Sequence, residues 1–176
     1  MAHAIEMFFD DEADAAVRRL WRRLADAGLP SLETRSHRRH RPHVSLTVTE
    51  SVDAADLAPL KSVLAGRRPT LSLYSLAVFP GGGGVILLAV PVTAELLSFH
   101  AEVHRSLTGQ PVEHWSHYLP GHWVPHCTLA QDEAMTPAEA GRAITVLDGY
   151  EPVTATVTSV GVTDTATGNI TPLTPA

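Results

Sequence analysis

The sequence predicts an α+β fold built as an internal duplication, in which two lobes of strands and helices face each other. One observation is a near-repeat: Pro42–Leu46 reads Pro-His-Val-Ser-Leu and Pro125–Leu129 reads Pro-His-Cys-Thr-Leu, one copy in each half of the chain. A second is that a helix, a motif strand and a helix follow one another twice, with a hairpin between. A third is that no change of composition marks a linker. We therefore expect one bilobal domain over residues 1–176, each lobe contributing one motif.

The first half contains four expected elements. Ala4–Phe9 is short and apolar and predicts a strand. Asp11–Ala27 has apolar residues at helical spacing, with acidic residues early and arginines late, as the helix dipole favours. Pro42–Thr49 alternates and contains β-branched residues, which predicts a strand. Asp53–Ala65 predicts a second helix, and Gly66 ends it.

A hairpin and a helix are expected in the middle of the chain. Apolar and polar residues alternate over Thr70–Phe79, which predicts a strand. Pro80–Gly84 is a glycine-rich turn, and Val85–Val90 is a wholly apolar strand. The glycines lack the Lys-Ser/Thr pair of a phosphate loop, so we interpret them as a hairpin tip. Thr93–Leu107 predicts a helix. Pro111–Gly121 predicts a loop rich in His, Trp and Tyr.

The last four elements complete the second copy. His122–Ala130 predicts the second motif strand. Thr136–Leu147 predicts a helix, with a threonine N-cap followed by proline in its first turn. Thr154–Val162 is rich in β-branched residues and predicts a strand. A turn at Thr167–Asn169 then leads to a short strand, Ile170–Leu173.

Charge is distributed unevenly along the chain. The formal net charge is −6, which argues against a general nucleic-acid coat protein. Residues 1–68 hold 11 of the 13 basic and 10 of the 19 acidic residues, a net charge near +1, so the remainder is near −7. We expect any anion-binding surface to use the first half, especially Arg35, Arg38, Arg39 and Arg41, which lead into the first motif. The alternative is a solvated basic loop.

Several classes of protein are disfavoured by composition. No apolar run approaches the ~18 residues of a membrane helix, and the N-terminus lacks the pattern of a secretory signal. Cys127 is the single cysteine, so no internal disulfide can form. We expect a cytoplasmic protein without a membrane partner. We also expect it to be a monomer.

The two motifs permit acid–base chemistry. On a strand, side chains alternate, so His43 and Ser45 share one face and His126 and Thr128 share another. Imidazole gains or loses a proton near neutrality, so two imidazoles suit in-line transfer at phosphorus. The two hydroxyls could donate to the charged oxygens of the transition state. The motif residues on the opposite face of each strand are expected in the core: Val44, Leu46, Cys127 and Leu129. A duplicated structural strand without catalysis is the alternative.

On these residues the chain resembles the 2H phosphoesterase superfamily, which includes the bacterial 2′-5′ RNA ligase and cyclic phosphodiesterase families. The family motif, His-x-(Thr/Ser)-x once in each half, matches His43–Leu46 and His126–Leu129. Phe79–Val90 and the helix with Leu96, Leu97 and His100 also look like the middle region of the family. The resemblance spans about residues 3–162.

The resemblance implies a pseudo-two-fold, bilobal fold with outer helices and both motifs lining a central cleft. It implies cleavage or ligation of RNA-like phosphodiesters without a metal or cofactor. His43 and His126 would be the acid–base pair, and Ser45 and Thr128 would bind phosphate oxygens. Which histidine is the base stays open. The implied partner is an RNA end or a small nucleotide with a cyclic or 2′-5′ phosphodiester.

Further candidates flank the motifs. Arg41 and Arg38 are candidate substrate-binding residues because they lie just before the first motif. Tyr118 and Trp123 could form a base-stacking wall before the second, although a loop packed by its own aromatic residues is the alternative. We expect His37 and His40 to be exposed, and His100 and His104 to form a polar edge of their helix.

Two other functions remain open at this stage. The same cleft could hold an RNA end or nucleotide without turning it over, as a binding module. Alternatively, His114, His117 and His122 could bind zinc.

Overall fold

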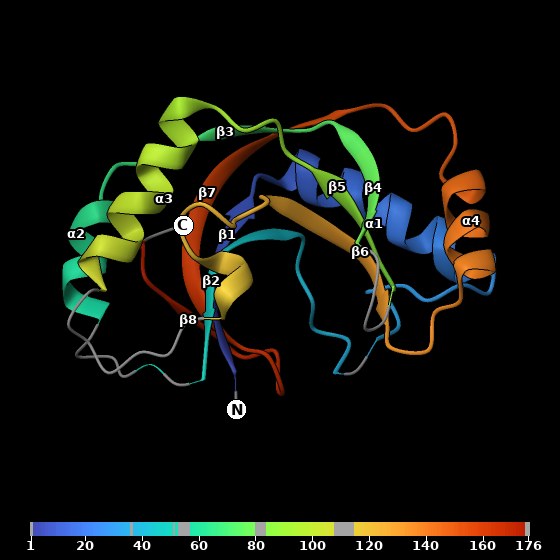
Figure 1. Cartoon of the computed structure of the whole chain (residues 1–176), viewed down its shortest axis with the longest axis horizontal. Helices are drawn as coiled ribbons and strands as arrows, with labels where there is room; N and C mark the ends of the chain where they lie inside the picture. The colour runs from blue at the N-terminus through green and yellow to red at the C-terminus, as the bar shows by residue number, and fades with distance from the viewer. Residues whose placement is uncertain are drawn as a thin grey trace.

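Two antiparallel sheets form the fold, and each has a motif strand at its edge (Figure 1). The computed structural model describes residues 2–35, 37–50, 52, 57–79, 84–107 and 115–174. The first sheet has the order β2-β1-β7-β3, with β8 added to β7: β1 (His3–Phe9), β2 (His43–Thr49), β3 (Thr70–Leu73), β7 (Val153–Asp164) and β8 (Ile170–Pro172). The second has the order β4-β5-β6: β4 (Ser75–Phe79), β5 (Gly84–Ala89) and β6 (His126–Asp132). The expected bilobal α+β fold is confirmed.

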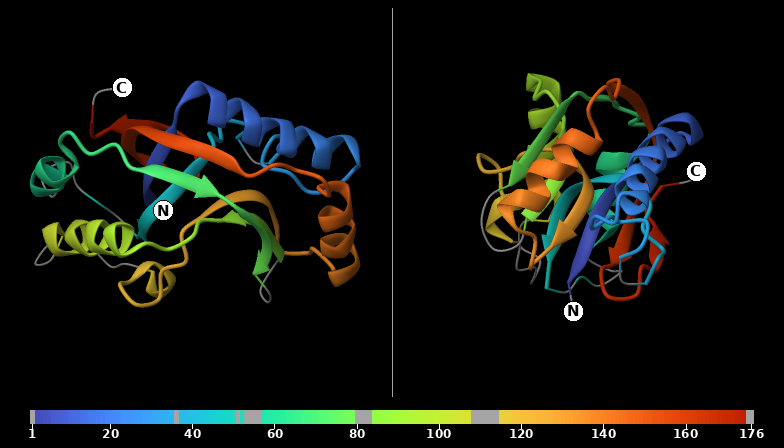
Figure 2. Two further views of the ribbon diagram at one scale, coloured as in Figure 1. Left: turned by 90° about the horizontal axis from the view of Figure 1, so that it is seen from above. Right: turned by 90° about the vertical axis from the view of Figure 1, so that its right-hand side faces the viewer.

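Helices cover the two sheets from different sides (Figure 2). They are α1 (Asp11–Asp26), α2 (Ala58–Leu64), α3 (Ala94–Ser106) and α4 (Pro137–Val146), with a short 3₁₀ turn, η2 (Ser116–Tyr118). α1 begins where the Asp10 carboxylate accepts from the Ala13 N–H, and it packs against β7, β6 and α4. α3 packs against α2 and β2. None of the helices in the described ranges is both long and apolar enough to cross a membrane.

The stretch expected as one strand, Thr70–Phe79, is two strands in different sheets. β3 pairs with β7 of the first sheet, whereas β4 pairs with β5 of the second. Tyr74 lies at the junction, and its N–H donates to the Ala89 carbonyl at 3.0 Å. Alternation alone could not reveal this division, because it does not say which neighbour a strand has.

Other boundaries differ in smaller ways. The second motif strand begins at His126 rather than His122, because Pro125 has no N–H for a sheet ladder. Its carbonyl instead accepts from the Val90 N–H at 3.0 Å. The expected hairpin tip at residues 80–83, and the helix start at residues 53–56, lie outside the described residues.

Each motif strand has a β-bulge at its motif leucine. The pairing passes directly from Ile5–Thr47 to Glu6–Ser45 in one copy, and from Ile86–Ala130 to Leu87–Thr128 in the other. Leu46 and Leu129 are therefore the extra residues of the two bulges. A bulge bends its strand and redirects the neighbouring side chains. The sequence repeat is thus also a repeat of one local irregularity.

The core is continuous between the sheets. It includes the four motif residues expected there, and all are fully buried: Val44, Leu46, Cys127 and Leu129. Burial raises the pKa of the Cys127 thiol to about 12, so the thiol stays protonated and is no nucleophile. His100 and His104 are also buried, at 1 % and 8 % exposure. The prediction that they form a polar edge of their helix is wrong, because that face of α3 packs against β2.

Histidines that are wholly or partly buried make the stability of the fold depend on pH. Burial is the largest cause lowering the pKa of His40 (to about 4), His100 and His126. The unfolded chain takes up these protons near pH 6.5, so between about pH 4 and 6.5 it binds more protons than the folded chain. Stability must therefore fall as pH is lowered through that window.

We expect a lower melting temperature at pH 5 than at pH 7.5, measured by calorimetry. The variant His122→Ala is a control, because His122 is exposed and its loss should leave the drop unchanged. A melting temperature that stays constant between pH 7.5 and pH 5 would contradict the role of these histidines in the pH dependence of stability.

Candidate active site

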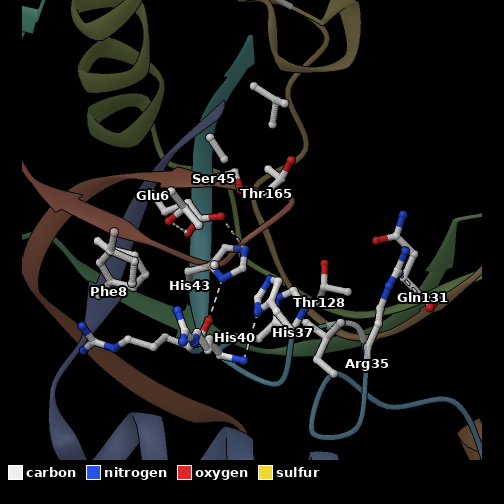
Figure 3. A pocket seen from close by; sticks show the side chains of 18 of the residues that line it. Glu6, Phe8, Arg35, His37, His40, His43, Ser45, Thr128, Gln131 and Thr165 are labelled. Carbon is white, nitrogen blue, oxygen red and sulfur yellow. Dashed lines mark hydrogen bonds and ion pairs between the residues drawn. The ribbon is translucent and has the colours of Figure 1, made fainter. Parts of the chain in front are cut away.

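Both motifs line one pocket of about 350 Å³ between the sheets (Figure 3). β2 contributes His43 and Ser45, and β6 contributes His126 and Thr128. All four side chains are partly exposed. The alternation expected from the sequence therefore holds in both strands, and the adjacent strands β2 and β6 bring the two copies together.

The two imidazoles are held in the same way. His43 Nδ1 lies 2.6 Å from the Arg41 carbonyl oxygen, and His126 Nδ1 lies 2.7 Å from the Val124 carbonyl oxygen. A carbonyl can only accept, so each Nδ1 donates. That contact fixes the ring orientation and leaves Nε2 of each ring as the nitrogen available for chemistry.

A buried carboxylate distinguishes the two rings. Glu6 on β1 is 5 % exposed and pairs with Ser45 across the strands. Its Oε1 lies 3.2 Å from His43 Nε2, and its Oε2 accepts from Thr163 Oγ1 at 2.5 Å. Sequence reasoning missed Glu6, although a single carboxylate within the apolar strand Ala4–Phe9 is a signal that could have found it.

No such carboxylate pairs with His126 among the residues that the structure describes. Burial lowers the pKa of His126, with a further decrease from the charge of His43 and an opposing increase from the Val124 carbonyl. The Phe79 ring meets it edge-on, at 4.9 Å between centroids. The surroundings of His126 therefore favour a neutral ring, whereas those of His43 offer a counter-ion.

Two indoles support the hydroxyl residues from behind. Trp21 Nε1 donates to the Thr128 carbonyl at 3.1 Å, and Trp123 Nε1 donates to the Ser45 carbonyl at 3.0 Å. The Trp123 ring stacks on His100, whose Nε2 lies 3.0 Å from the Leu46 carbonyl oxygen. Trp123 is 6 % exposed and lies outside the pocket lining. This corrects its predicted place on a substrate wall: its ring is a structural support.

The aromatic side of the pocket is formed by other residues. Tyr118 lines the pocket as predicted, and its hydroxyl hydrogen-bonds the Ser45 side chain. Burial, together with the charge of Glu6, raises its pKa, so the phenol remains a donor. Trp115 is 45 % exposed and also lines the pocket, where its backbone N–H donates to the Val48 carbonyl at 2.9 Å.

The basic loop before β2 reaches the pocket only in part. Arg41 lines it, with its guanidinium 4.7 Å from the centroid of the Phe8 ring. Arg38 is exposed at φ 57 and lies outside the lining, which corrects its predicted place at the site. Four of its neighbours line the pocket: Arg35 and Arg39, which were expected on an anion-binding surface, and His37 and His40, which were not. The expectation that His37 and His40 are exposed is wrong, because both are half-buried against it.

The histidines that could bind zinc, from the sequence, are His114, His117 and His122. His114 lies outside the described residues. Within the described part of the chain, no three His, Cys, Asp or Glu side chains are grouped as ligands of one metal ion.

Comparison with known proteins places the fold. A family model described as the 2′-5′ RNA ligase superfamily matches residues 9–169, which include both motifs but not Glu6. A structure of Kluyveromyces marxianus Usb1 with uridine monophosphate is 9 % identical, with a TM-score of 0.51, covering 99 % of this chain and 98 % of that one. This likeness supports the fold alone.

Two further structures are similar at lower scores. Kluyveromyces marxianus Usb1 in another structure is 12 % identical, with 99 % and 98 % of the two chains covered and a TM-score of 0.49. The MHV ns2 PDE domain is 20 % identical, with 76 % and 86 % covered and a TM-score of 0.49. No curated protein matched the chain.

Proposed function

Because the chain belongs to the 2′-5′ RNA ligase superfamily, we propose that it is a phosphoesterase that opens a 2′,3′-cyclic phosphate, or cleaves or joins a 2′-5′ linkage, at an RNA end or in a small nucleotide. The observation that carries the proposal is the pair of imidazoles, both oriented through Nδ1 and each accompanied by a hydroxyl, in one pocket. The Usb1 structure with uridine monophosphate supports a nucleotide as the class of ligand.

We assign His126 as the general base and His43 as the general acid in hydrolysis. His126 Nε2 takes a proton from water as the water oxygen bonds to phosphorus. The bond from phosphorus to the leaving ribose oxygen breaks, and that oxygen takes the proton from His43 Nε2. The contact with Glu6 supports this order, because Glu6 Oε1 lies 3.2 Å from His43 Nε2, the nitrogen from which the acid would give its proton.

Hydroxyl groups stabilise the charge that develops on the phosphoryl oxygens. Ser45 and Thr128 each lie two residues from a catalytic histidine on the same face of a strand. Tyr118, hydrogen-bonded to Ser45, and Arg41 at the pocket wall are the proposed substrate contacts around them. Donors held in place before reaction need no reorganisation when the charge appears.

Replacing Glu6 by glutamine should lower kcat/KM. Glu6→Gln removes the carboxylate beside His43 Nε2 and keeps the size of the side chain. We expect a larger loss with a ribose leaving group, which needs a proton, than with a p-nitrophenyl ester, whose leaving group needs none. Thr163→Val is the control, because it removes a hydrogen bond to Glu6 and keeps the carboxylate. Equal losses on the two substrates would contradict the assignment of His43 as the acid.

The activity itself is tested with 2′,3′-cyclic mononucleotides and 2′-5′ dinucleotides, with products separated by chromatography. We expect turnover that persists with a metal chelator, because the two imidazoles supply the acid and the base. Binding of these nucleotides in calorimetry without any product would instead favour a binding module and refute the enzyme.

Two broader expectations stay proposals. We propose that the protein works as a monomer, which light scattering would test. We also propose that it is cytoplasmic, since its one cysteine is buried and unpaired among the described residues. Microscopy of the tagged chain in its host would test that location.

A further inference from the structure

Positive charge is concentrated on one wall of the pocket. Arg35, Arg39 and Arg41 all line it, in a chain whose net charge is −6. Within the described residues none of these guanidinium groups pairs with a carboxylate. Glu6, the one carboxylate among the lining residues, already pairs with His43. The wall thus has cationic donors without a matching anion.

The loop that carries this wall is held from three directions. Arg35 Nη1 donates to the Gln131 carbonyl on β6 at 2.8 Å, and Arg39 Nη1 donates to Asn169 Oδ1 before β8 at 3.0 Å. Arg18 of α1 donates to the His40 carbonyl at 3.3 Å. A guanidinium has five N–H donors, so one anchoring bond leaves others to face a ligand.

His37 adds a buried donor to the same wall. Its Nδ1 accepts from the Arg39 N–H at 3.0 Å, so in the neutral ring the proton lies on Nε2. Nε2 is buried and has no hydrogen-bond partner in the described structure. The ring packs on Gly168, where a Cβ would lie 2.4 Å from His37 Cε1. A buried donor without an acceptor is costly, so a small turn of this ring that brings Nε2 to an anionic oxygen in the pocket would be favourable.

The wall lies close to the catalytic groups. Figure 3 shows His43 between Glu6 and the loop with His37 and His40, while Arg35 lies beyond Thr128 next to Gln131. A ligand with one phosphate at the two histidines therefore has this cationic surface beside it. A second anion on the same ligand would lie where the charge is unmatched.

We propose that Arg35, Arg39 and His37 form a second phosphate subsite, which takes the phosphate on the 5′-oxygen of the nucleotide whose 3′-phosphate lies at His43 and His126. This rests on the proposed function for the place of the first phosphate. It narrows the substrate class to a nucleotide that carries phosphate on both sides of its ribose. The last nucleotide of an RNA chain meets that description, as does a free bisphosphate.

Calorimetry with stable product-like ligands tests the subsite without turnover. Adenosine 3′,5′-bisphosphate should bind the intact chain at least about tenfold more tightly than adenosine 3′-monophosphate, since charge-assisted hydrogen bonds are the strong ones. Arg35→Gln and Arg39→Gln should each remove most of that preference and leave binding of the monophosphate nearly unchanged. Arg38→Asn is the matched control: it removes a charge from the same loop, at a residue outside the pocket.

The outcomes separate this proposal from the enzyme proposal. Equal affinities for the two ligands would overturn the subsite, even if cyclic phosphates are hydrolysed. If Arg38→Asn loses as much of the preference for the bisphosphate as Arg35→Gln does, the subsite is also overturned. The preference would then reflect the net charge of the loop and not a particular site. If the preference is present but no cyclic ester is cleaved, the subsite stands and the enzyme proposal fails.

Two further measurements strengthen the test. Gly168→Ala should displace the His37 ring and weaken binding of the bisphosphate but not of the monophosphate. A bisphosphate affinity that does not change would exclude His37 from the subsite. The dinucleotide ApA with a 3′-phosphate has its internal phosphodiester on the same 5′-oxygen. Tight binding of this dinucleotide indicates an RNA end, and weak binding indicates a free bisphosphate. Thermal melts of each variant confirm that it is folded.

Discussion

Replacement of His126 by alanine is expected to lower kcat/KM for a 2′,3′-cyclic nucleotide by about 10²–10⁴-fold. The reason is that His126 is the imidazole whose surroundings favour the neutral form, which a general base requires. Steady-state kinetics near neutral pH measures the effect. His122→Ala is the matched control, because His122 is exposed and lies outside the pocket lining.

The leaving group can show which histidine does which task. His43→Ala should lower kcat/KM by a similar factor when the leaving group is a ribose oxygen, because that oxygen needs a proton. With a p-nitrophenyl ester, whose leaving group needs none, His43→Ala should lose much less activity, while His126→Ala should still lose most of it. The opposite order would show that the two roles are exchanged. Full activity of either variant on cyclic nucleotides would refute two-histidine catalysis.

The second large effect is expected at the hydroxyl residues. Thr128→Val keeps the shape of the side chain and removes its donor, so kcat should fall by about 10²–10³-fold with a smaller change in KM. Ser45→Ala should behave alike, and it also removes the hydrogen-bond partner of the Tyr118 hydroxyl. The kcat and KM values from steady-state kinetics separate lost transition-state contacts from lost binding.

Thr128→Ser provides the control for this series. Serine retains the donor, and the first motif already uses it at the equivalent position, Ser45. We therefore expect Thr128→Ser to keep kcat within about tenfold of the parent chain. Equal losses in Thr128→Val and Thr128→Ser would contradict a role for the hydroxyl, because serine keeps the hydroxyl and should then keep most of the activity.

The elements closest to the chemistry could be predicted from the sequence. Alternation within a strand is a local property, so it correctly divided His43 and Ser45 from Val44 and Leu46. The near-identity of the two strings indicated that both copies face one site, and the pocket contains both. The fold class followed from the same duplication.

The rest depends on contacts between segments far apart in sequence. Glu6 reaches His43 because β1 and β2 pair with a bulge, and no local pattern specifies that register. Trp123 and Trp115 both precede the second motif, yet one is buried and the other exposed. That difference arises because Trp123 finds His100 of α3 as a stacking partner. The division of residues 70–79 between two sheets has the same kind of cause.

The two indole hydrogen bonds have a consequence for solubility as well as for the site. β2 and β6 each end a sheet, and the unpaired backbone groups of an edge strand can template pairing with another chain. Trp21 and Trp123 occupy one carbonyl on each of these strands, at Thr128 and Ser45. The two residues whose hydroxyls face the pocket therefore also have their backbone carbonyls occupied by an indole. Loss of either indole would leave one carbonyl of an edge strand without this donor, so we expect such a variant to self-associate more readily than the parent chain.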